Sequence, residues 1–585
     1  MSLFPVLALS LLWPATLFGQ DEKELAPVSR SYVVTNVNII QAPGRKIEMG
    51  TVVIKDGLIV SVGKGVPLPP DAIVVKADSM YMYAGFIDGL SHIGVTKPKE
   101  EQNREKVKDP GNPPADRAGI TPELDVRNML NPADKSIEEW RSLGFTIAQV
   151  VPYGVMLPGN AAIILLGGNS PDRLVLVSNS SLYSELSSNQ GVYPSTVIGV
   201  MAKWRELYRQ ASLSKSYEYL YASNRSGLER PTSDRILEAF YPVLDKKEPV
   251  LFKAEKMLDI YRVLALQSDL GFPLTLGNLK EGWDVAGKVK SSQAKVFLSL
   301  DLPEEKKPEA KPDSKKTDSK KPDDKKNDGK KVEDAKPAEK KDDKPKIKTP
   351  TDLEKEALEK RKADFVALYT GQASVYQKAG VSFGFSTLNA KSKDVSSNLR
   401  RIIAAGLPED QALASLTTVP AQLLGLSDRL GTVDIGKMAN LVISDKPYFT
   451  EKAKVRYVFV DGTIYKLDLT EAKKGNDKTK IDISGSWTFS SETPQGKNEN
   501  KVSFKKDGDT YTGTVSGGRI PQAMDLASVE LDGSSLKFTY SLNFGGNTFD
   551  VTVEGTLDGD SFKGTSTVGK FGSFSTEGSK DPKIK

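Results

Sequence analysis

The chain has a single histidine, His92, among its 585 residues, and it has no cysteine. The absence of cysteine excludes disulfides, thiolate metal sites and a cysteine nucleophile. His92 lies in the segment 83–95, which reads Tyr-Ala-Gly-Phe-Ile-Asp-Gly-Leu-Ser-His-Ile-Gly-Val. In this segment a short apolar run is followed by Asp88 and then by polar residues, a pattern that predicts the carboxyl end of a strand. An imidazole at such a strand end can ligate a metal ion or act as a general base.

The segment 83–95 resembles the opening of the catalytic barrel in the amidohydrolase superfamily, which reads Gly-Phe-Ile-Asp-x-His-x-His. The two histidines of that motif point the same way from one strand and bind a metal. Here Leu90 stands at the first histidine position and His92 at the second. Two further stretches, 120–146 and 409–431, resemble the region after the first barrel strand and the closing helix. The first of these is most similar to the imidazolonepropionase-like branch of the superfamily.

The resemblance implies a metal site at the carboxyl ends of the barrel strands. Its members use a His-x-His pair, a carboxylated lysine or a glutamate, two further histidines and an aspartate, and the ions activate water and polarise a carbonyl group. At matching positions this chain has Leu90, Lys253 and, in place of the proton-shuttling aspartate, Leu388. Leucine cannot ligate, and an unmodified lysine repels a divalent cation. Because a catalytic divalent site usually takes three protein ligands, we expect a degenerate metal site in which His92 is the one matching ligand.

Three hypotheses follow for the function. The first is an exported protein of this superfamily, nominally a hydrolase of non-peptide C–N bonds, with an eroded metal site and weak or no activity. Its barrel pocket would be lined by Leu90, Lys253 and Leu388. The second is a non-enzymatic binding or scaffold protein of the cell envelope, acting through that pocket or through a C-terminal β domain. The third is a hydrolase with one weakly bound divalent ion, such as Zn²⁺, on His92. No catalytic residue or substrate is assigned.

The elements that must position these residues are strands alternating with helices. Between residues 85 and 430, strand-like apolar runs alternate with helical patterns, as parallel βα units do. We therefore predict a (β/α)8 barrel over 85–430, in agreement with the family resemblance. The strand-like runs after the first are 145–152, 161–166, 174–178, 196–200, 249–252, 272–276, 294–300 and 381–385.

Short alternating strands with tight turns lie on both sides of the predicted barrel. Residues 31–84 and 431–468 contain apolar runs separated by Asp-Gly turns, which favour hairpins. We expect the two flanks to form one small β-sandwich. Residues 480–580 also read as alternating strands with Gly-rich turns, which predicts a C-terminal antiparallel β domain. Its Gly-Ser-Trp start loosely resembles lipocalin-type barrels, so a ligand cup is the alternative to a filled structural or interaction module.

Two further segments differ in composition. Residues 1–20 are apolar and lack acidic residues, and charged residues follow from 21, so we expect a signal peptide and a periplasmic or extracellular protein. Residues 302–350 are rich in Lys, Asp, Glu and Pro and predict a disordered insert within the barrel. The net charge of +5 shows no basic excess typical of nucleic-acid binding. The sequence predicts no membrane span in the mature chain, allows a small-molecule ligand, and leaves the oligomeric state open.

Overall fold

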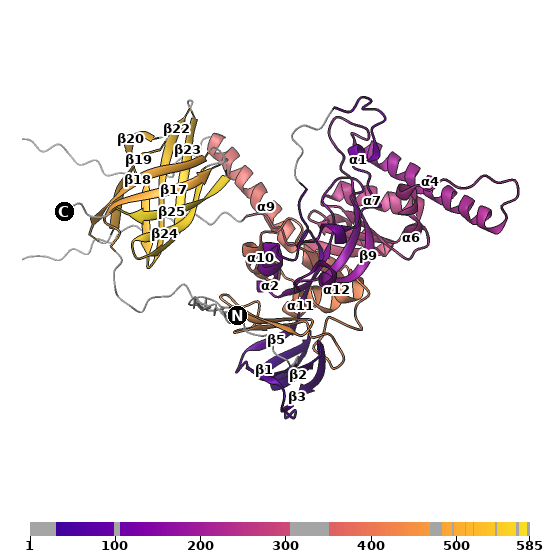
Figure 1. Cartoon of the computed structure of the whole chain (residues 1–585), viewed down its shortest axis with the longest axis horizontal. Helices are drawn as coiled ribbons and strands as arrows, with labels where there is room; N and C mark the ends of the chain where they lie inside the picture. The colour runs from indigo at the N-terminus through magenta and orange to yellow at the C-terminus, as the bar shows by residue number, and fades with distance from the viewer. Residues whose placement is uncertain are drawn as a thin grey trace, which may run out of the picture. The chain divides into compact units, whose positions relative to one another are not determined.

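The computed structural model describes residues 31–98, 106–304, 350–467 and 482–581, with short gaps at 494–495, 509, 519, 545–546 and 569–571. The chain divides between residues 468 and 469 into two compact units (Figure 1). The predicted signal peptide and residues 305–349 of the predicted insert lie outside the described residues. No helix in the described part of the chain is long and apolar enough to cross a membrane.

An eight-stranded sheet forms the centre of the first unit, in the order β13-β12-β11-β10-β9-β8-β7-β6. The first and last strands also lie side by side: the Ser386 hydroxyl on β13 donates a hydrogen bond to the Leu90 carbonyl on β6 at 2.9 Å. The sheet is thus a nearly closed barrel, and the predicted fold class is confirmed. The strands are β6 (Phe86–Ser91), β7 (Phe145–Val150), β8 (Gly159–Leu165), β9 (Val175–Glu185), β10 (Val250–Lys253), β11 (Leu274–Leu279), β12 (Lys295–Ser299) and β13 (Phe383–Ser386).

One barrel strand departs from the parallel pattern. Strand β8 runs antiparallel to both β7 and β9, whereas the other neighbouring strands are parallel. Only residues 151–158 separate β7 from β8, and a parallel crossover needs a dozen or more residues. The short connection therefore reverses the chain, and the barrel has no crossover helix at this point.

One predicted strand is wrong. The run 196–200 opens the long helix α4 (Val197–Ser223), which projects from the barrel in Figure 1. The Thr196 side chain caps this helix by accepting a hydrogen bond from the Gly199 amide at 3.1 Å. Val200 and Trp204 then lie one turn apart and are both fully buried. Packing at helical spacing thus overrides the strand preference of β-branched residues.

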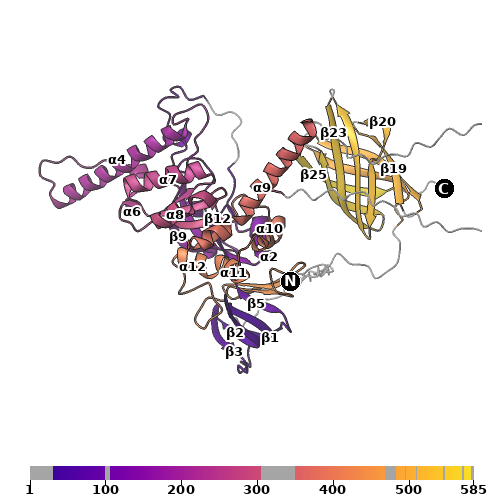
Figure 2. The same ribbon diagram turned by 180° about the vertical axis from the view of Figure 1, so that it is seen from behind.

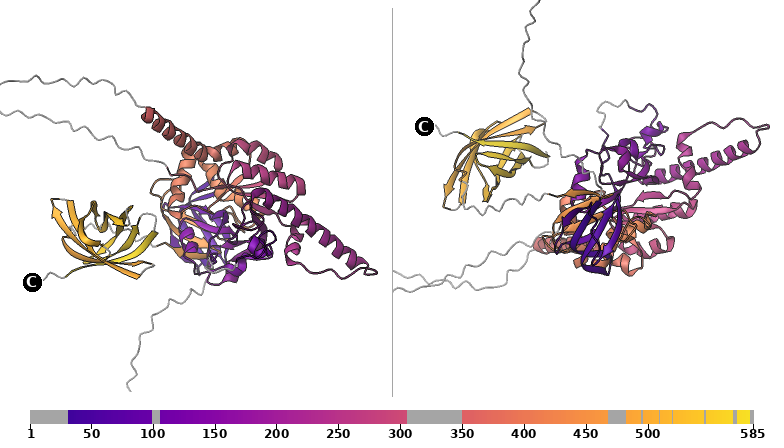
Figure 3. Two further views of the ribbon diagram at one scale, coloured as in Figure 1. Left: turned by 90° about the horizontal axis from the view of Figure 1, so that it is seen from above. Right: turned by 60° about the horizontal axis from the view of Figure 1, so that its bottom comes forward.

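Helices gather around the barrel strands, as the views from behind and from above show (Figures 2 and 3). A cluster of aromatic rings packs the projecting helix against the sheet: the Trp204 ring lies 5.5 Å from that of Phe252 and 5.2 Å from that of Phe272. The remaining helices are α1 (Ala115–Ala118), α2 (Lys135–Ser142), α3 (Pro171–Leu174), α5 (Arg235–Glu238), α6 (Tyr241–Leu244), α7 (Met257–Leu270), α8 (Ala286–Ser292), α9 (Pro350–Lys378), α10 (Ser392–Ala404), α11 (Glu409–Leu416) and α12 (Thr418–Leu423), with 3-10 turns at Val126–Met129 and Trp283–Val285.

The two flanks of the barrel join in a second sheet, in the order β16-β15-β14-β5-β1-β2-β3, with β4 beside β1. Strand β14 from the late flank pairs with β5 from the early one. Gly85 then leads directly into the first barrel strand, and a Cβ at this position would lie 2.1 Å from Thr146 Oγ1. The strands are β1 (Ser31–Ala42), β2 (Arg45–Lys55), β3 (Leu58–Gly63), β4 (Ile73–Lys76), β5 (Tyr81–Ala84), β14 (Leu441–Ser444), β15 (Val455–Val460) and β16 (Thr463–Lys466).

The second unit is a nine-stranded antiparallel sheet, in the order β20-β19-β18-β17-β25-β24-β23-β22-β21. Its buried face is lined by aromatic side chains, with the Phe489 ring 5.2 Å from that of Phe538 and 5.1 Å from that of Phe562. These rings belong to an apolar core formed by the strands of this unit. The strands are β17 (Gly485–Thr493), β18 (Gly496–Asp507), β19 (Thr510–Gly517), β20 (Ile520–Asp525), β21 (Ser528–Asp532), β22 (Ser535–Phe544), β23 (Asn547–Asp558), β24 (Ser561–Val568) and β25 (Gly572–Lys580).

Candidate functional site at the barrel mouth

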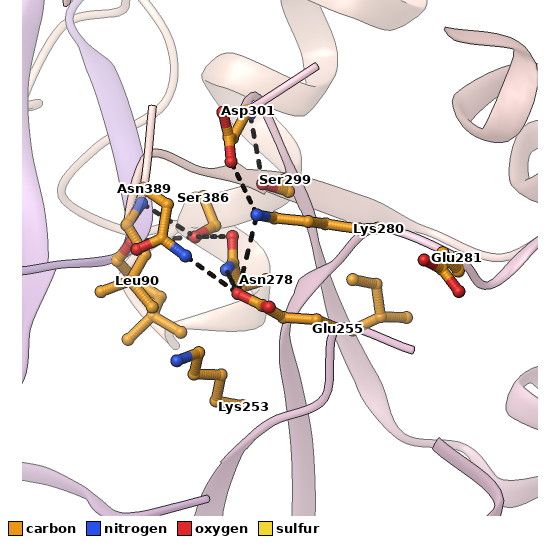
Figure 4. A network of polar contacts seen from close by, with 12 residues as sticks. Leu90, Lys253, Glu255, Asn278, Lys280, Glu281, Ser299, Asp301, Ser386 and Asn389 are labelled. Atoms are coloured by element: carbon orange, nitrogen blue, oxygen red, sulfur yellow. Dashed lines mark hydrogen bonds and ion pairs between the residues drawn. The ribbon is translucent and has the colours of Figure 1, made fainter. Parts of the chain in front are cut away.

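Apolar side chains occupy the carboxyl ends of the first barrel strands. Leu90 at the end of β6 is fully buried, and Leu388, which follows β13, packs against the same cluster. The structure therefore brings together two of the three predicted pocket residues, and Lys253 lies next to Leu90 in Figure 4. Leu90 is thus a member of an apolar cluster inside the barrel. Its other members are Val151, Ala161, Tyr183 and Leu251.

Leu90 is matched by a glycine on the opposite side of the barrel. A Cβ placed on Gly277 of β11 would lie 2.6 Å from Leu90 Cδ2. The leucine thus fills space that any side chain at position 277 would need. Leu90 can therefore pack at this place only because residue 277 is a glycine.

Substituting this pair tests that arrangement. We expect Gly277→Ala to destabilise the barrel by about 1–3 kcal/mol, because the added methyl overpacks a filled core. Leu90→Ala should cost about 2–5 kcal/mol by opening a cavity. The double variant should be more stable than the sum of the two losses predicts, by about 0.5 kcal/mol or more. Urea unfolding of the four proteins measures this coupling, and strictly additive losses would contradict the contact.

His92 is held as a neutral imidazole. Its Nδ1 lies 2.9 Å from the Val151 carbonyl oxygen, and its ring stacks on Tyr153 with centroids 3.8 Å apart. Burial lowers the pKa of His92 to about 4, and the positive charge of Lys253 acts in the same direction. Because Nδ1 faces a carbonyl oxygen, it carries the proton, and Nε2 keeps its lone pair. The ring can therefore accept a hydrogen bond or ligate through Nε2 alone.

Lys253 is paired with an acid that sequence reasoning missed. Its ammonium group lies 3.2 Å from Glu185 Oε2, and both side chains are largely buried. Strands β9 and β10 are parallel with Lys253 opposite Glu185 and Leu251 opposite Tyr183. Since residues two apart on a strand point to one face, the ion pair lies one step above the apolar cluster.

A second set of polar side chains surrounds Glu255, just after β10 (Figure 4). Glu255 Oε1 accepts hydrogen bonds from the Nδ2 atoms of Asn278 at 2.7 Å and Asn389 at 2.9 Å. The Lys280 ammonium lies 3.7 Å from the same oxygen and 2.6 Å from Asp301 Oδ2. Sequence reasoning missed these residues too. The available signal was that each lies at or just after the end of an apolar barrel strand, where functional residues of this fold gather.

Asp88 joins the first and last barrel strands from within. It is fully buried, and its Oδ1 accepts hydrogen bonds from the backbone amides of Leu90 and Thr387, each at 3.1 Å. Its Oδ2 contacts the Thr387 hydroxyl. Burial raises the pKa of Asp88 to about 7, although these hydrogen bonds act in the opposite direction. A carboxyl group thus closes the barrel in a dry environment.

Comparison with known proteins relates part of this chain to one protein family. Residues 369–466 match the model of the amidohydrolase family. An amidohydrolase from Thermotoga maritima of known structure is 20% identical, with a TM-score of 0.55, and the match covers 74% of this chain and 100% of that one. The matched segment is thus similar to the amidohydrolase family, and the first unit shares the fold of a solved amidohydrolase. The family match includes β13 and therefore the end of the barrel at which Leu388 and Asn389 lie.

Two further known proteins are more limited matches to this chain. The N-acetylglucosamine-6-phosphate deacetylase of Caenorhabditis elegans is 51% identical over 43 residues, which are 7% of this chain and 10% of that protein. The matched region thus spans about a tenth of the length of that curated relative. A prolidase crystallised with N-methylphosphonate-L-proline is 18% identical over 74% of this chain and 99% of its own, with a TM-score of 0.39.

Within the described residues, no group of three or more His, Cys, Asp or Glu side chains lies close enough together to hold a metal ion. His92, Lys253 and Leu388 follow or end barrel strands, and no group of three or more such ligands includes His92 within the described residues. The roles of His92, Leu90, Lys253 and Leu388 in binding stay predictions.

Proposed function

We propose that this chain is an exported member of the amidohydrolase superfamily that has lost metal-dependent hydrolysis of C–N bonds, so that its barrel mouth serves for binding. One observation carries the proposal: the position of the first metal-binding histidine holds Leu90, which is fully buried in an apolar cluster. Export is supported by the apolar run 1–20, by the charged residues that follow it and by the lack of cysteine.

The donor set at the barrel mouth does not fit a divalent ion. Leu90 offers no lone pair, and the Lys253 ammonium pairs with Glu185 at 3.2 Å. His92 has one nitrogen engaged by a carbonyl oxygen and can offer only Nε2. A cation held there would face an ammonium group rather than a second imidazole, and Coulomb repulsion at a few ångströms in a partly dry site is strong. No reaction step is therefore assigned to a metal.

Metal analysis of the purified full chain tests this proposal. After dialysis against Zn²⁺ or Mn²⁺ and removal of free ions, we expect metal content far below one ion per chain. Because His92 then has no ion to hold, His92→Ala should have the same metal content as the unaltered protein. We also expect no turnover of cyclic amides or dipeptides. Elemental analysis by mass spectrometry and amine-release assays give the two readouts.

Stoichiometric metal that disappears in His92→Ala would instead support a one-ion hydrolase and overturn the proposal. Export is tested separately, by finding whether the mature chain begins near residue 20 in the secreted or periplasmic fraction. An uncleaved chain that stays in the cytoplasm would contradict that part. The alternative binding surface is the C-terminal β unit, whose apolar core contains aromatic rings.

A further inference from the structure

We propose that the second unit binds a hard metal cation of the size of Ca²⁺, between β18 and the turn that joins β19 to β20. The inference is carried by a buried amide oxygen without a protein partner, by two further oxygens close to it, and by a glycine that places no side chain among them. It concerns the second unit alone and does not depend on the function proposed for the barrel.

Asn500 on β18 supplies the buried oxygen. Its side chain is 8% exposed, and its Oδ1 atom has no hydrogen-bond partner within the described residues. Asn500 pairs with Phe489 of β17, whose ring belongs to the apolar core of this unit. Because paired residues point to the same face of a sheet, the Asn500 side chain points to the interior as well. A buried amide oxygen without a partner carries a desolvation cost, which a ligand offsets.

Two more oxygens lie close to Asn500 Oδ1. A Cβ built on Gly518, in the β19–β20 turn, would lie 2.4 Å from Asn498 Oδ1 and 2.6 Å from Asn500 Oδ1. The Glu499 carbonyl oxygen lies 2.9 Å from the same point. Residues 498 and 500 are two apart on one strand, so their side chains share a face. Three oxygens of consecutive residues therefore surround one point beside the glycine.

Gly518 itself does not satisfy these oxygens. It presents a Cα–H group to them, which is a weak donor. Neighbouring oxygens without a strong donor between them repel one another, and a cation between them replaces this repulsion by attraction. Gly518 is exposed, Asn498 is half-buried and Asn500 is buried. An ion can therefore reach the oxygens from the side of the turn.

The oxygens select the class of ligand. Backbone carbonyl and asparagine oxygens are ligands of Ca²⁺, and an ion about 2.4 Å from each of two oxygens needs them to lie within about 5 Å of each other. The two amide oxygens meet this condition, because they lie 2.4 and 2.6 Å from one point. Asparagine χ2 is broad, so both amides can turn toward an ion. The oxygens are neutral, so we expect a Kd of about 10⁻⁴–10⁻³ M, with water completing the coordination.

Calorimetric titration of the purified full chain with CaCl₂ tests the inference. The protein is first treated with a chelator and held in choline chloride, so that no other metal cation competes. We expect saturable binding of about one Ca²⁺ per chain and weaker binding of Mg²⁺, which demands a more nearly ideal octahedron at shorter distances. Scanning calorimetry should show that saturating CaCl₂ raises the unfolding temperature of the second unit by about 5–10 °C.

Variants of Asn500 give effects of opposite sign. Asn500→Leu removes a ligand and should weaken Ca²⁺ binding about tenfold or more, while the ion-free protein stays at least as stable because an unpaired oxygen is removed. Asn500→Asp adds a negative charge to the ligands and should strengthen binding about tenfold or more, since ligand charge tunes calcium affinity. Loss of folding cannot strengthen binding, so this sign separates recognition from stability.

Two further variants control for position. Gly518→Ala places a methyl group among the three oxygens and should abolish binding. Because φ is +57° at Gly518, alanine is also strained there, and its unfolding temperature without Ca²⁺ is measured alongside. Thr556→Asp adds the same charge as Asn500→Asp on the exposed face of β23 and should bind Ca²⁺ like the unaltered protein.

Absence of a saturable response to Ca²⁺, equal affinity in Asn500→Leu, or strengthening by Thr556→Asp as large as that by Asn500→Asp would overturn the inference. His92→Ala should bind Ca²⁺ like the unaltered protein, because His92 lies in the other unit. An ion held at millimolar affinity is lost when free ions are removed. The metal content measured for the barrel is therefore independent of this site, and either proposal can fail without the other.

Discussion

A Gly89→Ala variant is expected to lose about 3 kcal/mol or more of barrel stability and much of its soluble yield. The added Cβ would lie 1.9 Å from Cδ1 of Phe297, whose side chain is fully buried. The same ring lies 2.7 Å from the Cβ position of Gly384, next to Pro420 of α12. The Phe297 ring on β12 therefore lies against both β6 and β13, and it is fully buried.

Unfolding in urea, followed on the full chain, measures the effect on the first unit. The matched control is Gly287→Ala in α8, where nothing lies within 4 Å of the new Cβ. This control should be neutral or stabilising by up to about 1 kcal/mol, because alanine favours a helix over glycine. Adding Phe297→Leu should recover part of the loss in Gly89→Ala. A Gly89→Ala protein as stable as the control would show that the ring does not seal the barrel.

The barrel and its flanking sheet could be predicted because their signals are local. The segment 83–95 carries its own strand end, and the Asp-Gly turns of the two flanks mark hairpins without reference to the rest of the chain. The pairing of β14 with β5 then follows the family resemblance. The reversal of β8 was missed because an apolar run has the same appearance in either strand direction.

The polar arrangement at the barrel mouth could be predicted only in part. The positions of Leu90 and Lys253 followed from the family motif. However, the contact of Leu90 with Gly277 joins residues on opposite strands, and neither residue signals the other in the sequence. Asn278 and Asn389 meet on Glu255 only because three strands end at one rim. Such convergence depends on strand tilt and register, which a single sequence does not give.

Barrel closure by Asp88 is expected to make stability fall as pH rises. Burial raises the pKa of Asp88 from 3.8 to about 7, so between these values the folded chain keeps a proton that the unfolded chain releases. Stability from this group is fully present below pH 3.8 and is lost as pH rises through about 7. Linkage gives a slope of up to about 1.4 kcal/mol per pH unit in this window. Above about pH 7, Asp88 causes no further change in stability with pH.

Two substitutions separate this charge effect from the hydrogen bonds. Asp88→Asn keeps an oxygen for the Leu90 and Thr387 amides and is always neutral, so the difference in stability between it and the unaltered chain should change with pH only between about 4 and 7. Taking that difference cancels other groups such as Glu248, whose pKa burial also raises to about 7. Asp88→Ala should be about 3–5 kcal/mol less stable than Asp88→Asn at every pH, because it leaves buried donors without partners and neither variant titrates at this position. Urea unfolding at a series of pH values measures both variants. A pH-independent difference for Asp88→Asn would mean that the carboxyl is ionised in the folded barrel, with its hydrogen bonds outweighing burial.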